Sequence, residues 1–185
     1  MTAKNPHSLL KGIGNDFVVF WIMATGAVCI GLLVNQFRDQ PLALTYQTKA
    51  ERMSETVERM GAQAPTAAEV ATKSDHLSLQ ELRIFVESKQ GVVLDARPNV
   101  FFRLGHIPGA LSLPRNDFEN GYAVLRKVLE VDKNQAIVVY CSEDDCDDSE
   151  LAAQALRRLG YTNVRLFKGG WAAWVDKDLP QEMAL

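Results

Sequence analysis

The chain lacks the charge pattern of a nucleic-acid-binding protein. Its 185 residues carry a formal net charge of −3, and aromatic residues make up 8%. Lys and Arg are scattered along the sequence and form no basic stretch with interleaved aromatic residues, so no nucleic-acid partner is expected. The length and the 47% hydrophobic content suit one ordinary domain with a buried core, together with a smaller extra segment.

Charged residues are absent from residues 17–37, where most side chains are apolar. At about 1.5 Å per residue, a helix of this length crosses a hydrocarbon core of roughly 30 Å. One transmembrane helix is therefore predicted at 17–37, preceded by an N-terminal tail at 1–16. The apolar run is longer than the core of a cleaved signal peptide, and no small-x-small cleavage site follows it, which favours an uncleaved anchor.

The orientation of this helix is not decided by its flanking charges. Lys4 and Lys11 precede it, whereas Arg38, Lys49 and Arg52 follow it, so the positive-inside counts nearly cancel. A short N-terminus before an anchor usually stays in the cytoplasm. On that basis the main domain is expected on the periplasmic side of a bacterial inner membrane.

A polar and amphipathic linker is predicted at 38–76. Within it, apolar residues recur at spacings of four, three, four and three: Tyr46, Ala50, Met53, Val57 and Met60. This spacing is typical of a helix that pairs with another helix, but it equally suits a mobile spacer or a helix on the membrane surface. Residues 61–72, rich in Ala, are expected to be the last linker before the globular domain.

From residue 77 to 185, helix-like and strand-like segments alternate, which predicts an α/β domain with an open parallel sheet flanked by helices. Ser78 and Glu81 form a capping box for the first helix, which Gly91 is expected to close. Strands are predicted at 92–94, 111–113, 136–140 and 164–167, and further helices at 122–130 and 149–159.

The strand at 136–140 leads directly into Cys141 and a polar loop before a helix. Ligands of open α/β sheets bind beyond the carboxyl ends of the strands. Backbone N–H groups at the start of a helix lack internal partners and can support an anion or a thiolate. Cys141 is therefore the main candidate for chemistry, with a sulfur atom expected to be accessible at the edge of the sheet.

Four segments resemble rhodanese-like domains in order and spacing: Asp95-Ala96-Arg97, Gly105-His106-Ile107-Pro108-Gly109-Ala110, Ile137-Val138-Val139-Tyr140-Cys141 and Gly169-Gly170-Trp171-Ala172-Ala173-Trp174. The resemblance covers roughly 77–182. An anchor followed by one such domain also resembles a group of small bacterial membrane-anchored members. The resemblance implies that Cys141 accepts a sulfane sulfur as a persulfide and passes it to a thiol or to cyanide.

The same resemblance places Asp95 and Arg97 beside the active loop and His106 in a turn. All three are expected to act mainly as structural supports, with Asp95 accepting N–H bonds and His106 hydrogen-bonded in its turn. Trp171 and Trp174 lie three residues apart on one helix face, which favours packing in the core.

The loop after Cys141 departs from the family pattern, because it is about two residues longer and contains no Lys or Arg. Its predicted substrate-binding residues are Ser142, Glu143, Asp144, Asp145, Asp147, Asp148 and Ser149. With Glu150, six carboxylates would face a thiosulfate dianion. Several such charges outweigh the 0.3–1 kcal/mol expected from a helix N-terminus, so weak activity with thiosulfate is predicted.

Cys146 lies close enough to Cys141 to form a disulfide or to resolve a persulfide, or else it packs inward as a small apolar residue. No metal or cofactor is expected. The Cys-x4-Cys pair has no second ligand pair elsewhere in the chain, and the acidic residues lack the glycine of a calcium loop.

Two functions remain open. The first is a membrane-tethered enzyme of sulfur transfer or thiol redox, with Cys141 as nucleophile and a thiol or persulfide protein as donor or acceptor. The second is a non-catalytic accessory subunit of a membrane complex.

Overall fold

The computed structural model describes residues 6–38, 46–61 and 76–184, with side chains described from residue 17 onward. The chain divides into two units, residues 1–47 and residues 48–185. The predicted linker segment at 61–72 lies almost wholly outside the described residues.

The first unit consists of one long helix, α1 (Pro6–Gln36). Its part Phe17–Gln36 is long and apolar enough to cross a membrane by length and composition. The helix begins within the predicted N-terminal tail, and it ends one residue before the predicted end of the transmembrane segment. Cys29, within this span, is a free cysteine.

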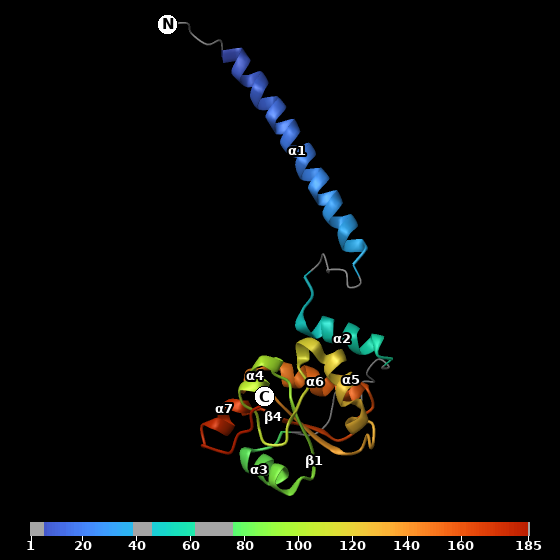
Figure 1. Cartoon of the computed structure of the whole chain (residues 1–185), viewed down its shortest axis with the longest axis vertical. Helices are drawn as coiled ribbons and strands as arrows, with labels where there is room; N and C mark the ends of the chain where they lie inside the picture. Colours follow the sequence, from blue (N-terminus) through green and yellow to red (C-terminus); the bar gives the residue numbers. More distant parts are fainter. Residues whose placement is uncertain (1–5, 39–45, 62–75, 185) are drawn as a thin grey trace. The chain divides into compact units, whose positions relative to one another are not determined.

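The second unit is built on a four-stranded parallel sheet with the order β2-β1-β3-β4. Figure 1 shows α2 on one side of this unit and α3 on the opposite side. The strands are β1 (Gly91–Asp95), β2 (Leu111–Ser112), β3 (Ala136–Tyr140) and β4 (Val164–Phe167). The open parallel α/β sheet predicted from the alternating segments is confirmed, including the central place of the strand that leads to Cys141.

Helices cover both faces of the sheet. Successive side chains of β3 point to opposite faces, so the strand contributes to a separate core on each face. Ile137 and Val139 point into one core, under α2 (Lys49–Arg59), α5 (Phe118–Leu129) and α6 (Asp147–Arg158). Val138 and Tyr140 point into the other core, with α3 (Leu79–Ser88) and α7 (Gly170–Val175).

The capping box at the start of α3 is present, since the Ser78 side chain accepts from the Glu81 N–H and Glu81 accepts from the Ser78 N–H. The predicted end of this helix is wrong in detail. Lys89 adopts the left-handed conformation that closes α3, with φ of 51°. Gly91 is instead the first residue of β1, where an added Cβ would collide with the Ala136 carbonyl of β3.

Helix α2 belongs to the second unit, which begins at Thr48. The expected domain boundary at residue 77 stays a prediction. The side chains of Met53 and Val57 are buried in the core shared with α5 and α6. Met60 is partly buried and packs against the same core, so the helix-pairing interpretation of the apolar spacing holds for these three residues. Tyr46 lies before the start of α2 and is exposed, and Ala50, in its first turn, is also exposed.

Two local features differ from the sequence-based expectation. A short helix, α4 (Asn99–Leu104), follows β1 where a loop was expected, and its six residues are too few to show helical periodicity. Helix α6 begins at Asp147 and not at Ser149. Acidic residues in the first turn of a helix are favoured by the helix dipole. The observed loop after Cys141 is therefore two residues shorter than the predicted one.

Candidate active site at the carboxyl edge of the sheet

The carboxyl ends of β1 and β3 lie side by side at the point where the chain connections diverge. From β1 the chain leads to β2 on one side, and from β3 it leads to β4 on the other. Asp95 pairs in register with Tyr140, so Cys141 follows directly beside the end of β1. Such a switch point is where ligands of open α/β sheets bind. The structure thus brings Asp95 and Cys141 to one site.

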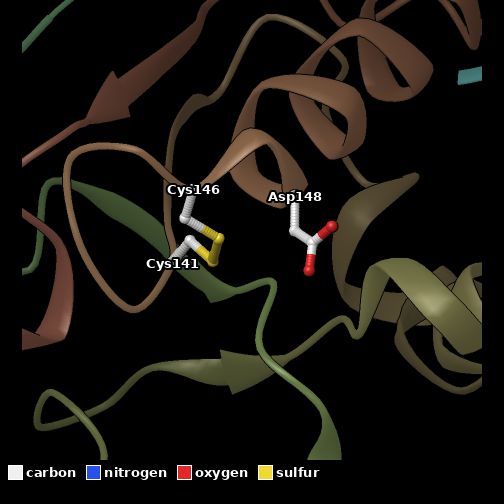
Figure 2. Close-up of side chains that lie close together, drawn as sticks. All are labelled: Cys141, Cys146 and Asp148. Carbon is white, nitrogen blue, oxygen red and sulfur yellow. A yellow bond between two sulfur atoms is a disulfide. The ribbon is translucent and has the colours of Figure 1, made fainter. Parts of the chain in front are cut away.

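Cys141 and Cys146 form a disulfide across the loop that joins β3 to α6 (Figure 2). Their Cα atoms lie 6.1 Å apart, within the usual range for such a bond. Of the alternatives for Cys146, pairing with Cys141 is therefore the one found in the structure. This disulfide state contains no free thiolate at either position.

The expectation of an accessible Cys141 sulfur is corrected by its burial. Cys141 is 2% exposed, whereas Cys146 is half-buried. Helix α7 contacts the backbone beside Cys141 closely: a Cβ on Gly170 would lie 2.7 Å from the Cys141 carbonyl oxygen. Cys146 is thus the more accessible half of the disulfide.

The first part of the loop is held by helix α7 through its backbone. The Trp171 N–H donates to the Cys141 carbonyl at 2.8 Å, and the Ala172 N–H donates to the Ser142 carbonyl at 2.9 Å. Gly170 has a φ of 61°, which a residue with a side chain rarely adopts. The Cys146 N–H donates to Glu143 within the loop, so this amide is already paired.

The acidic residues of the site lie mostly at the surface. Ser142, Glu143, Asp144 and Asp145 are exposed in the loop. In the first turn of α6, Asp147 is exposed, Asp148 is partly buried and Ser149 is buried. The predicted substrate-binding residues are therefore divided between loop and helix, and the exposed carboxylates give the surface of the loop a negative charge.

Asp95 and Arg97 form a buried ion pair at the end of β1, next to the strand end that carries Cys141. Arg97 donates through Nε to Asp95 Oδ1 at 3.0 Å, and its backbone N–H donates to the same oxygen. The Tyr140 hydroxyl donates to Asp95 Oδ2 at 2.7 Å. Burial, and then the nearby Asp95 carboxylate, raise the pKa of Tyr140 well above its usual range.

Two aromatic contacts complete this buried group. The Arg97 guanidinium lies 4.7 Å from the centre of the Trp171 ring, so Trp171 does more than fill the core. Trp174 is buried in the core as expected. His106 stacks on Phe102, and its Nδ1 lies 2.9 Å from the Phe102 carbonyl oxygen, in agreement with a hydrogen-bonded turn residue.

Two basic residues missed by the sequence analysis contact Asp148. Arg115, in the short helix η1 (Arg115–Asp117), contacts Asp148 Oδ1 through Nε at 3.0 Å. Lys49 at the start of α2 contacts the same oxygen at 3.2 Å. They lie 33 and 99 residues from Asp148 in the sequence, so inspection of the loop alone gives no signal for them.

Cys141, Cys146 and Asp148 offer two sulfurs and a carboxylate oxygen within 4.8 Å of one another (Figure 2). In a dithiol state these groups could ligate a metal, but a structural zinc site needs four ligands. Asp148 already pairs with two cations. The absence of a metal site stays a prediction.

The fold and the site define an α/β protein with a cysteine pair at the switch point of a parallel sheet. A family model described as "Rhodanese-like domain" matches residues 78–177. The chain belongs to the rhodanese-like domain family. This confirms the family proposed from the four motifs.

Curated relatives match about half of this chain. The adenylyltransferase and sulfurtransferase UBA4 of Saccharomyces cerevisiae is 31% identical over 90 residues, which are 46% of this chain and 20% of that protein. A tRNA uridine(34) hydroxylase of Erwinia tasmaniensis is 30% identical over 96 residues, which are 51% of this chain and 27% of that protein. The chain thus matches about a fifth to a quarter of the length of these two proteins.

Solved structures agree with the fold. The rhodanese-like domain of the Alr3790 protein from Anabaena is 26% identical, with a TM-score of 0.50, covering 61% of this chain and 81% of that one. The BH2092 protein from Bacillus halodurans has a TM-score of 0.51 at 20% identity, covering 74% of this chain and 87% of that one. At that identity, the second likeness shows the fold alone.

Proposed function

We propose that this protein is a membrane-anchored sulfur-transfer protein in which Cys141 accepts a sulfane sulfur and Cys146 releases it. The observation that carries the proposal is the disulfide between these two cysteines, at the carboxyl end of β3 in a rhodanese-like domain. A nearby second thiol is what a persulfide needs for resolution within one loop. The sulfurtransferase among the similar proteins supports the same chemistry.

The proposed cycle starts from the dithiol. The Cys141 thiolate attacks the outer sulfur of a donor persulfide R–S–SH, which forms Cys141–S–SH and releases the thiolate R–S⁻. The Cys146 thiolate then attacks the inner sulfur on Cys141, which forms the disulfide and releases HS⁻. An external dithiol protein reduces the disulfide and is itself oxidised to a disulfide, so atoms and electrons balance over the cycle.

Burial decides where the external thiol attacks. Cys146 is half-buried and Cys141 is almost fully buried, so an incoming thiolate reaches the Cys146 sulfur first. Attack there forms a mixed disulfide on Cys146, and Cys141 leaves as the thiolate. A second thiol of the reductant then resolves the mixed disulfide. Reduction thus frees the sulfur-accepting residue directly.

The acidic loop favours protein-bound or uncharged donors over thiosulfate. Five of the six carboxylates between Glu143 and Glu150 are exposed, and like charges repel a dianion at short range. Salt screens this repulsion. Weak turnover with thiosulfate and cyanide is therefore expected, with a rise in rate as ionic strength increases.

Intact-mass measurement tests the sulfur cycle. The full-length protein in detergent is reduced, freed of reductant and treated with a persulfide donor. In Cys146→Ser, one added sulfur atom is expected to persist on Cys141. The wild type should instead release sulfide and return to the disulfide. Cys141→Ser is the matched control and should gain no sulfur at the loop; Cys29 is present in both variants, so any sulfur on it adds equally to both. Equal loading of both single variants contradicts the assignment of roles.

The membrane part of the proposal rests on the apolar span Phe17–Gln36. We place the domain on the periplasmic side of a bacterial inner membrane. A membrane-impermeant maleimide, applied to intact cells after an impermeant reductant, should then label Cys146. Labelling that requires permeable reagents contradicts the periplasmic placement.

A non-catalytic accessory subunit is the second candidate, and the 2% exposure of Cys141 favours it. Complex assembly and cellular function in the Cys141→Ser variant discriminate between the two candidates. An intact phenotype supports the accessory role, and its loss together with loss of sulfur loading supports the sulfur-transfer role.

A further inference from the structure

Arg115 contacts Asp148 from a backbone that is hydrogen-bonded just after the end of β1. Its N–H donates to the Ala96 carbonyl at 3.1 Å, directly after the last residue of the strand. Its side chain is only 12% exposed, and its Nε donates to Asp148 Oδ1. A guanidinium keeps its charge at every working pH, so a permanent cation faces the site.

Lys49 supplies a second cation from outside the residues that match the family. It is the first residue of α2, whose position is fixed by the buried Met53 and Val57. The capping box between Thr48 and Glu51 orders the same turn. The Lys49 ammonium and the Arg115 guanidinium thus converge on one carboxylate oxygen.

Asp148 links the converging cations to the sulfurs. A carboxylate oxygen of Asp148 lies within 4.8 Å of the sulfurs of both Cys141 and Cys146 (Figure 2). Two cations and one carboxylate leave a local charge of about +1, in contrast to the acidic loop around them. Asp148 occupies the place where an acid group would bind between the cations.

We propose that Arg115 and Lys49 form an anion-binding site beside the cysteine pair, which Asp148 fills in the disulfide state and an acid group of a sulfur donor takes in the dithiol state. The ligand class is a small thiosulfonate or a persulfide with an acid group. This inference rests on the proposed sulfur-transfer function and adds the way in which an anionic donor is held despite the acidic loop.

The chemistry follows from where the acid group sits. In a thiosulfonate R–SO₂–S⁻, the oxygens are two bonds from the sulfur that is transferred, so binding of the oxygens near Arg115 brings that sulfur toward Cys141. The Cys141 thiolate attacks the terminal sulfur and forms Cys141–S–S⁻. The sulfur–sulfur bond of the donor breaks, and its electron pair leaves with the sulfinate R–SO₂⁻.

A matched pair of reagents isolates the effect of the donor's charge. Methanethiosulfonate is an anion, and S-methyl methanethiosulfonate is its neutral ester; both modify the same thiol and release the same sulfinate. Their rates are measured by intact mass on reduced, full-length Cys146→Ser protein in detergent. The rate with the anion is divided by the rate with the ester. A change in the reactivity of the Cys141 thiolate affects both rates equally and cancels in this ratio.

Loss of either cation should lower this ratio. One unit charge at about 5 Å in a watery surrounding is worth roughly a four- to tenfold change in rate. Arg115→Gln and Lys49→Gln are each expected to reduce the ratio by about that factor, and Arg115→Lys should retain most of it. Arg126→Gln, which removes the same charge from the exposed face of α5, should change it less than about twofold.

Removal of the competing carboxylate should have the opposite effect. Asp148→Asn is expected to raise the ratio about fivefold, because the cations are then free for the donor. Asp144→Asn removes an equal charge from the exposed loop and should change the ratio less than about twofold. A fall in the ratio for Asp148→Asn, or equal effects of Lys49→Gln and Arg126→Gln, overturns the proposal, even if Arg115→Gln does not fold.

The result also separates this inference from the proposed function. If Cys141 gains sulfur but the ratio does not depend on Lys49, Arg115 or Asp148, only the anion site is wrong. If no donor, anionic or persulfide, ever loads Cys141, the sulfur-transfer function itself is wrong, and the anion site falls with it.

Discussion

The ends of β1 and β3 lie next to each other in the sheet, yet their charged groups are arranged in different ways. After β1, Asp95 and Arg97 are buried, paired with each other and in contact with Tyr140. After β3, the carboxylates are mostly exposed, and within the described chain only Asp148 among them has an ion-pair partner. The buried group at the end of β1, called the first corner, therefore fixes the positions of its own side chains. The acidic loop at the end of β3, called the second corner, leaves charge available to a ligand or partner.

The largest expected effect comes from the buried corner. Arg97→Ala leaves the Asp95 carboxylate buried without its cation, which typically costs about 3–5 kcal/mol. The free energy of unfolding of the full-length protein in detergent, measured by urea denaturation, should fall by about that amount. Arg83→Ala is the matched control, because its pair with Glu87 is exposed. Similar midpoints for both variants would contradict the difference between buried and exposed pairs.

A smaller loss is expected in the helix that brings Lys49 to the second corner. Met53→Ala removes a side chain that is 6% exposed in the core shared with α5 and α6. Truncation of a buried methionine costs about 2–5 kcal/mol, and the lower end is expected for a helix at the edge of the core. Arg52→Ala, on the exposed side of α2, is the control. If Met53→Ala unfolds with the wild-type midpoint, α2 is not part of the folding unit.

Reduction of the disulfide is expected to have an effect of about 2 kcal/mol. Cys141 and Cys146 are five positions apart, and closure of so short a loop removes little entropy from the unfolded chain. The urea midpoint should shift on addition of a reductant in the wild type and stay unchanged in Cys146→Ser. A shift of equal size in that variant would show that the reductant acts elsewhere.

The smallest effect is expected from Tyr140 at high pH. Burial raises the pKa of Tyr140 in the folded state above the value of about 10 in the unfolded chain. Its contribution to stability is therefore complete below about pH 10 and is lost as the pH rises toward the folded value. Tyr140→Phe should lose about 1 kcal/mol at neutral pH, with a shallower decline above pH 10 than the wild type. An unchanged decline contradicts this assignment.

The strands and the start of α3 were predictable from local patterns, whereas Asp95 and Arg97 were placed by the family resemblance. An unbroken apolar run indicates a buried strand, and Cys141 follows the run at 136–140 directly. The capping box at Ser78 likewise acts within one turn of helix. Such signals lie within a few residues of the feature they specify, which is why sequence inspection recovers them.

The second corner was only partly predictable, because its decisive contacts join distant parts of the chain. The acidic loop and the cysteine pair were identified, whereas Lys49 and Arg115 were not. The apolar spacing of Met53 and Val57 predicted a helix but not its partner, since burial depends on a surface formed by α5 and α6. The burial of Cys141 also depends on α7, which approaches through Gly170.

The hydrogen bonds from α7 to the Cys141 and Ser142 carbonyls hold the start of the loop against a rigid helix, whereas the rest of the loop is closed only on itself, by the Cys146 N–H bond to Glu143 and the disulfide. A change in the identity of Asp144 or Asp145 therefore alters the surface charge of the loop and leaves Cys141 in register with the sheet.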